Sequence, residues 1–111
     1  MAAGSVHIPW YATFFRGDRF AEALEEIAPL AIRYGATSYT VYRSRDDQYK
    51  FLHAVNFEDK LDWQRYWDGP EFTDWRAKYT SWYQVPVLYV WNDIVTAGHA
   101  ETVGLSQTQA G

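Results

Sequence analysis

A histidine in the middle of a strand-like run is the first candidate for acid–base chemistry. His53 stands between Phe51 and Val55, two residues from each, and free imidazole has a pKa of about 6.5, which suits proton transfer at neutral pH. We therefore name His53 as a candidate catalytic base. A lone histidine among aromatic side chains is more commonly a hydrogen-bonded core or interface residue, and that interpretation stays open.

Three further polar side chains could donate hydrogen bonds to a developing oxyanion, and we name Arg43, Asn56 and Tyr42 as candidate catalytic residues on that ground. Each also has a plainer interpretation. Arg43 can pair with Asp46 or Asp47 near the same turn, Asn56 can close the turn between a strand and a helix, and Tyr42 can fill an interface.

Aromatic side chains could wall a pocket for a flat organic ligand, because the chain is 19% aromatic and holds six Trp and nine Tyr. The candidate substrate-binding residues are Tyr11, Trp63, Trp67, Tyr89 and Trp91. An aromatic row at helical spacing is more often core than ligand cage. A core and a dimer interface built from aromatic rings is therefore the alternative.

Composition removes several other kinds of site. The chain has no cysteine, so it has no disulfide, no thiolate nucleophile and no thiolate metal ligand. The net charge is −4 and the basic residues are scattered, which gives no support to nucleic-acid binding. We expect no metal and no cofactor. No apolar run is long enough to cross a membrane, so we expect a cytoplasmic protein without a membrane partner.

Two kinds of periodicity define the elements that would position these residues. Alternating apolar positions predict strands over residues 7–16, 36–45, 49–57 and 85–94. A helix is predicted from an N-cap at Asp18 to a stop at Gly35, with a break near Ala28 because Pro29 lacks an N–H. A second helical region begins at Asp59 and is divided in two by the pair Gly69 and Pro70.

The order βαββαβ predicts an α+β, ferredoxin-like fold, in which a four-stranded antiparallel sheet of order 4-1-3-2 carries both helical regions on one face. All four strand runs are apolar or aromatic on both alternating sets. In residues 85–94 one set is Val85, Val87, Tyr89 and Trp91. The uncovered face should therefore pack against a second copy or a ligand, since a soluble monomer rarely leaves such a patch bare. We expect a homodimer.

The chain resembles the dimeric α+β barrel superfamily, and within it the antibiotic biosynthesis monooxygenase-like branch. The likeness covers about residues 6–95 and is carried by the runs HAVNFEDKLDWQRYW, residues 53–67, and WDGPEFTDW, residues 67–75. In that superfamily two open sheets pack face to face into a barrel. The branch includes oxygenases that act on phenols or quinols without metal or flavin, and also haem-degrading enzymes. The latter hold haem through a histidine on the second helix, and residues 60–67 contain none.

The resemblance and the aromatic content together give a first hypothesis, a cofactor-independent monooxygenase-like enzyme acting on a small aromatic metabolite. The alternative is a non-catalytic homodimer that binds a small ligand or serves as an interaction protein. We expect a single ferredoxin-like barrel domain over residues 6–95. Residues 96–111 lack periodicity and are expected to form a flexible C-terminal tail.

Overall fold

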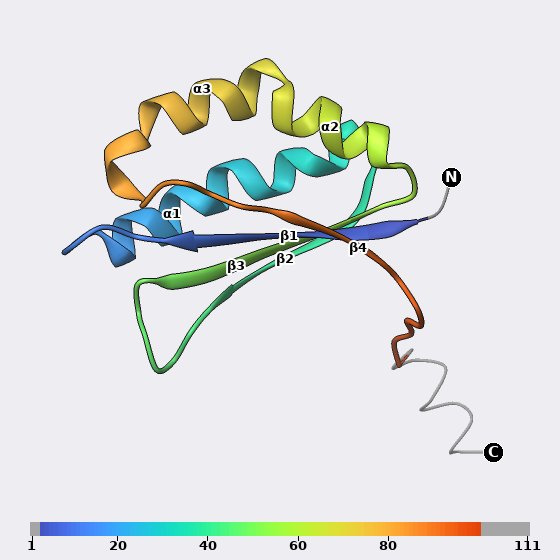
Figure 1. The fold of residues 1–111 in the computed structure, drawn as a ribbon, viewed down its shortest axis with the longest axis horizontal. Helices are drawn as coiled ribbons and strands as arrows, with labels where there is room; N and C mark the ends of the chain where they lie inside the picture. Colours follow the sequence, from blue (N-terminus) through green and yellow to red (C-terminus); the bar gives the residue numbers. More distant parts are fainter. Residues whose placement is uncertain (1–2, 101–111) are drawn as a thin grey trace.

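The strand-forming runs pair into one antiparallel sheet of order β2-β3-β1-β4, which confirms the predicted order (Figure 1). This computed structural model describes residues 3–100. The strands are β1 (Gly4–Tyr11), β2 (Ala36–Arg43), β3 (Lys50–Phe57) and β4 (Val90–Asp93). The helices are α1 (Gly17–Ile27), α2 (Lys60–Asp68) and α3 (Pro70–Lys78), with two 3-10 helices, η1 (Ala28–Tyr34) and η2 (Thr80–Trp82). All of them lie on one face of the sheet, as expected for the ferredoxin-like arrangement.

The helix boundaries follow the predicted signals, with one exception. α1 gives way to the 3-10 helix η1 at Ala28, and η1 ends at Gly35, whose φ of 103° is left-handed. Asp59 caps α2 by accepting a hydrogen bond from the Leu61 N–H at 2.9 Å. Asp18 is not the N-cap of α1. Arg16 holds that position without a side-chain cap.

A single aromatic-rich core fills the space between the sheet and the helices. Trp10 lies at its centre, with ring centroids 5.7 Å from Phe20, 5.3 Å from Trp75 and 5.0 Å from Tyr83. Edge-to-face contacts of this kind add to the stabilisation that burial of the rings supplies. None of the six tryptophans is exposed. The aromatic surplus of the sequence therefore serves this core.

All four strands differ from their predicted limits, β2 and β3 by one or two residues at one end and β1 and β4 by more. β1 begins and ends earlier than predicted. It ends early because the chain turns where the Arg16 N–H bonds to the Thr13 carbonyl. β4 is only four residues long, so the predicted strand over 85–94 is wrong for residues 85–89 and for Ile94.

Pro9 explains the short β4. The Tyr11 carbonyl accepts from the Gln84 N–H on the β4 side of β1, so Pro9, two residues earlier, faces the same side and has no N–H to offer. Between the pairs His7–Val90 and Tyr11–Gln84, β1 has three intervening residues and the last segment has five. The longer segment bows away from β1.

The first residue of β1 approaches the sheet edge closely. A Cβ on Gly4 would lie 2.2 Å from the ring of Trp91, the β4 residue that pairs with Val6. Only glycine fits beside this indole. At the other end of the chain, residues 96–100 of the predicted tail form no helix or strand, and residues 101–111 lie outside the described part.

Candidate functional site

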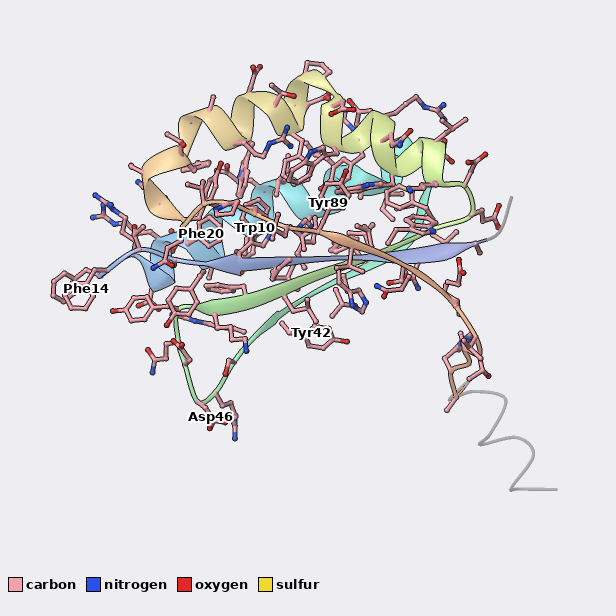
Figure 2. The ribbon with its side chains drawn as sticks, viewed as in Figure 1. Trp10, Phe14, Phe20, Tyr42, Asp46 and Tyr89 are labelled. Atoms are coloured by element: carbon pink, nitrogen blue, oxygen red, sulfur yellow. The ribbon has the colours of Figure 1, made fainter. Side chains whose placement is uncertain are left out.

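The residues proposed from the sequence lie in separate regions of the molecule. His53 is in the core, and Arg43 lies at the end of β2 beside α1. The aromatic candidates on the helix side are Trp63, Trp67, Tyr89 and Trp91. Tyr11, Tyr42 and Asn56 lie on the sheet face that carries no helix. Figure 2 shows Tyr42 pointing away from the helices, and Trp10, Phe20 and Tyr89 lying between the helices and the sheet.

His53 is fully buried, which bears on its candidate role as a base. Its Nδ1 accepts a hydrogen bond from the indole Nε1 of Trp10 at 3.3 Å, and its ring lies 6.2 Å from that of Phe72. Burial lowers the pKa of His53 to about 3. The imidazole is therefore neutral at pH 7 with its basic nitrogen already bonded, an environment that fits a core residue better than a proton acceptor.

Three of the aromatic candidates form one cluster where α2 meets the last segment. The ring of Tyr89 is 4.8 Å from that of Trp63 and 5.3 Å from that of Trp67. Arg76 covers the other side of the cluster, with its guanidinium 3.8 Å from the Trp67 ring and Nη1 2.9 Å from the Trp67 carbonyl. Partial burial lowers the pKa of Arg76. The cluster is closely packed, and it stabilises the junction between α2 and α3.

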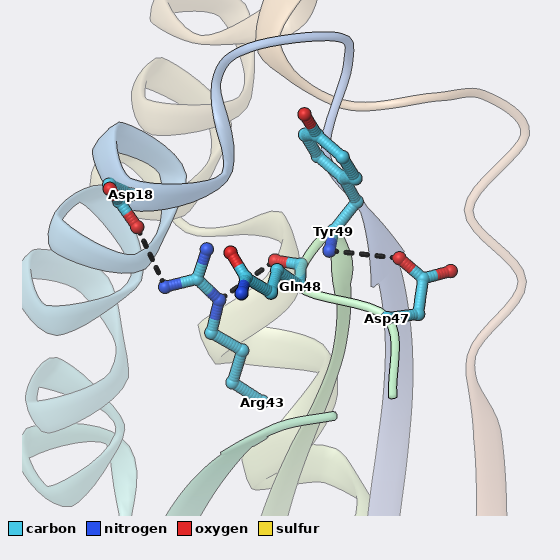
Figure 3. Close-up of polar contacts among 5 residues, drawn as sticks. All are labelled: Asp18, Arg43, Asp47, Gln48 and Tyr49. Carbon is cyan, nitrogen blue, oxygen red and sulfur yellow. Dashed lines mark hydrogen bonds and ion pairs between the residues drawn. The ribbon is translucent and has the colours of Figure 1, made fainter. Parts of the chain in front are cut away.

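Arg43 ties the β2–β3 hairpin to α1 (Figure 3). Its Nη1 lies 2.9 Å from an Asp18 carboxylate oxygen, and its Nε donates to the Gln48 carbonyl at 2.8 Å. The guanidinium also lies 5.2 Å from the Phe51 ring. The expected alternative partners Asp46 and Asp47 are not used. With these donors engaged, Arg43 positions the hairpin.

The hairpin has a second anchor on the uncovered face. The Tyr11 hydroxyl donates to Asp47 at 2.5 Å, and Asp47 also accepts from the Tyr49 N–H at 3.0 Å. The hydrogen bond to Asp47 raises the pKa of Tyr11, while the bonds from Tyr11 and Tyr49 lower the pKa of Asp47. The Tyr11 hydroxyl thus holds the hairpin in place through Asp47.

The uncovered face carries three rows of side chains across the strands, as the strand register defines them. The first row is polar and holds Ser38, Asn56, Ser5 and Asn92. The middle row holds Thr40, Ala54, His7 and Val90. The third is apolar and holds Tyr42, Leu52 and Pro9. This face is therefore less aromatic than the sequence predicted. The tryptophans that lie in the strands all face the helices instead.

A groove of about 530 Å³ lies over the small side chain of Ala54 at the centre of this face. It is lined by Ser5, His7, Ser38, Thr40, Tyr42, Leu52, Ala54 and Asn56. Two predicted site residues, Tyr42 and Asn56, therefore share one hollow of the size that small-molecule sites have. A second hollow of about 270 Å³ adjoins it and shares Tyr42 and Leu52.

His7 is the ionisable residue of the groove that the sequence-based candidates omit. No hydrogen bond within residues 3–100 engages its imidazole or the carboxamide of Asn56. The alternation of side chains along β1 could have identified His7 from the sequence. Ile8, Trp10 and Ala12 form an apolar set that belongs to the core, so His7 must face the other way.

Two other kinds of site have no support in the described part of the chain. Residues 3–100 contain no group of three histidine or acidic side chains placed to hold a metal ion. No helix within the same range is long and apolar enough to span a membrane.

Comparison with solved structures identifies the fold. A mutant form of SnoaB, a cofactor-independent oxygenase from Streptomyces nogalater, superposes with a TM-score of 0.75 at 12% identity, over 87% of this chain and 97% of the other. The chain shares the fold of this oxygenase.

Other structures with this fold agree. One named as an antibiotic biosynthesis monooxygenase superposes with a TM-score of 0.74 at 13% identity, covering 84% of this chain and 99% of that one. NE2512, a protein of unknown function from Nitrosomonas europaea, gives 0.76 at 17% identity over 91% and 97%. No protein-family model matches the sequence, and no curated protein matches it. The predicted resemblance is confirmed for the fold.

Proposed function

We propose that this chain forms a homodimer through its uncovered sheet face and binds a small aromatic molecule in the groove that the pairing encloses. The observation that supports this most directly is the groove itself. It is lined by hydroxyl, imidazole, carboxamide and phenol groups, and no helix covers it. Convergent polar groups in a hollow of this volume are typical of small-molecule sites.

The charge of the face favours a second copy as its partner. In a two-fold pairing each surface meets its own equivalent, so a charged face would repel itself. Among the strand residues of the described part, Lys50 is the single charged side chain on this face, and it lies at the end of β3. The chain as a whole is 22% charged. Two copies of the uncovered face could therefore meet with little repulsion between like charges.

The size of the face is also adequate. The three long strands have eight residues each, or about 26 Å at a rise of about 3.3 Å per residue. Four strands about 4.8 Å apart give a width of about 19 Å, hence a flat area of about 500 Å² before the relief of the side chains is counted. A standard interface buries about 800 Å² of accessible surface per partner. The two values are of the same order.

Paired sheets also account for the exposed apolar side chains near the groove. Tyr42 is 56% exposed and Val90 is 55% exposed in the single chain. Val90 opposes His7 on the uncovered face. Covering such side chains would contribute about 25 cal/mol per Å² of apolar surface removed from water.

For activity, we propose cofactor-independent oxygenation of a phenol or quinol in this groove. The support is the fold shared with the Streptomyces nogalater oxygenase, together with hydrogen-bond donors that could stabilise a phenolate. Asn56 and Tyr42 keep their proposed roles as polar contacts. The burial of His53 favours the second candidate, a ligand-binding dimer without catalysis, since the sequence offered His53 as the base.

Sedimentation velocity at micromolar concentration tests the pairing. We expect the wild type to sediment as a dimer and Leu52→Glu, which places a charge on the uncovered face, to sediment as a folded monomer. Leu61→Glu is the matched control, because Leu61 is exposed on α2. A wild-type monomer, or an unaffected Leu52→Glu dimer, would refute the proposed interface.

Oxygen consumption separates the two candidate functions. A panel of phenols and quinols is incubated with the protein and no added cofactor, and dissolved oxygen is followed with an electrode. Uptake that Asn56→Leu lowers at least tenfold would support the oxygenase. Binding of the same compounds by calorimetry without any uptake would support the non-catalytic dimer.

A further inference from the structure

Building on the proposed pairing, we propose that the groove takes a flat phenol-type molecule lying along β3 and that His7 accepts the proton of its hydroxyl group. Neither the residue nor the orientation follows from the shared fold. Both follow from the order of side chains on the uncovered face.

The rows of that face give the groove an apolar end and a polar end. Leu52 and Asn56 lie four residues apart on β3, or about 13 Å along the strand. Ala54 lies between them and leaves the floor low. A single ring can rest on Ala54 with its apolar edge toward Leu52 and Tyr42 and its polar substituent toward Asn56. The reverse orientation would bury the polar substituent among apolar groups, which is costly.

The expected sheet spacing makes the site flat. Packed sheets lie about 10 Å apart, a distance that the larger side chains of the two faces determine. The lining of the groove includes Ser38, Thr40 and Ala54, which are too short to meet their equivalents across that gap. Two such hollows facing each other would leave a slot that suits a planar molecule better than a bulky one.

His7 is placed beside the ligand at the middle of the slot. It lies in the same cross-strand row as Ala54 and Val90, neither of which can ionise. The titratable side chains on this face of the described strands are Tyr11, Tyr42 and Lys50 besides His7. Tyr11 is bonded to Asp47. Of these side chains, an imidazole is the one that most often serves as a general base in proteins.

The proposed step is a proton transfer without oxidation. The O–H bond of the bound phenol breaks, its electron pair remains on the oxygen, and a new N–H bond forms on the imidazole of His7. The products are a phenolate and an imidazolium held side by side. The carboxamide of Asn56 and the hydroxyl of Ser5, which oppose each other across β3 and β1, can donate hydrogen bonds to the phenolate oxygen.

Absorbance titration of 4-nitrophenol with the wild-type protein tests this step, because the phenol and the phenolate absorb differently. At one fixed pH the ratio of phenolate to phenol should rise about tenfold on binding, and His7→Gln should abolish the rise while binding persists. His99→Gln, which removes an exposed imidazole from the segment after β4, should behave as wild type. Nitrogen NMR of the wild type should show the His7 ring becoming imidazolium when the probe is added.

The outcomes separate this inference from the proposed function. Binding of 4-nitrophenol with no change in its ionisation, or an equal change in His7→Gln, would overturn the role of His7 and leave the binding site standing. An unchanged His7 ring in the NMR experiment would do the same without any variant. Failure of the wild type to bind the probe would overturn both the site and the proton transfer.

Discussion

Trp10 and His53 are joined in the core by a hydrogen bond from the indole Nε1 to the imidazole Nδ1, 3.3 Å long. The remaining imidazole proton is therefore on Nε2, which has no partner within the described residues. A neutral ring satisfies Trp10, whereas a protonated ring would lose the accepting nitrogen. This side-chain hydrogen bond, which links β1 to β3, thus depends on His53 remaining uncharged.

This dependence predicts acid sensitivity. The pKa of His53 is about 3 in the folded chain and about 6.5 when unfolded. Between these values the unfolded state binds more protons than the folded state. The free energy of unfolding should therefore be highest above about pH 6.5 and fall by up to about 1.4 kcal/mol per pH unit below it. Denaturant unfolding at several pH values measures the slope.

The matched comparison for this prediction is His53→Leu against His7→Gln. His53→Leu should reduce the slope between pH 6.5 and 4 although it lowers stability at pH 7 by leaving the Trp10 N–H unpaired. His7→Gln should keep the slope, because it leaves the buried pair of Trp10 and His53 unchanged. Equal slopes in all three proteins would show that another group governs acid unfolding.

Tyr66 should contribute to stability through its hydroxyl. It donates to the carbonyl of Ile27 at 2.5 Å, where α1 passes into η1, and both residues are buried. Tyr66→Phe removes this buried hydrogen bond and should cost about 0.5–1.5 kcal/mol. Chemical denaturation measures the loss. Tyr39→Phe is the control, because the Tyr39 hydroxyl makes no hydrogen bond within residues 3–100. This substitution should change stability by less than about 0.5 kcal/mol.

Phe15 is held in a strained backbone conformation. Its φ is 67° and its side chain is 81% exposed. A left-handed conformation costs a non-glycine residue about 1–2 kcal/mol, so Phe15→Gly should raise the free energy of unfolding by about 0.5–1 kcal/mol after the flexibility of glycine is deducted. Phe14→Gly, next along the loop and outside the left-handed region, should give no gain. A loss of stability in Phe15→Gly would mean that the ring makes a contact worth more than the strain.

Filling the groove should block it. Ala54→Phe places a ring on the floor of the hollow, and we expect the affinity for 4-nitrophenol to fall at least tenfold, or by about 1.4 kcal/mol or more. Ala77→Phe adds the same ring to an exposed position of α3 and should leave the affinity unchanged. Retained binding in Ala54→Phe would place the ligand elsewhere.

Local chemistry made most of the fold predictable. Pro29 shifts the first helical region into a 3-10 helix, and Gly69 with Pro70 divides the second, as their backbone limits require. Antiparallel strands with right-handed connections left one strand order, which the structure has. These features depend on neighbours in the chain or on general rules of handedness.

Features that depend on distant partners were not predictable in the same way. Asp18 is a good N-cap by type, yet its carboxylate is drawn to Arg43, 25 residues away. The limits of β4 depend on Pro9, which lies in another strand. His53 was a candidate base by its residue type and its place in a strand, with a core role as the alternative. The packing of Trp10 and Phe72 around it shows a buried ring. His7 required knowledge of which alternate set faces outward.

The close approach of Gly4 to Trp91 implies a constraint on how this sequence can evolve. Any side chain at position 4 would collide with the indole, so a lineage that retains the tryptophan can accept no replacement of the glycine. The two positions should drift only together, a smaller residue at 91 preceding or accompanying any change at 4. Substitution records from close homologues would then show them covarying although they lie at opposite ends of the described chain.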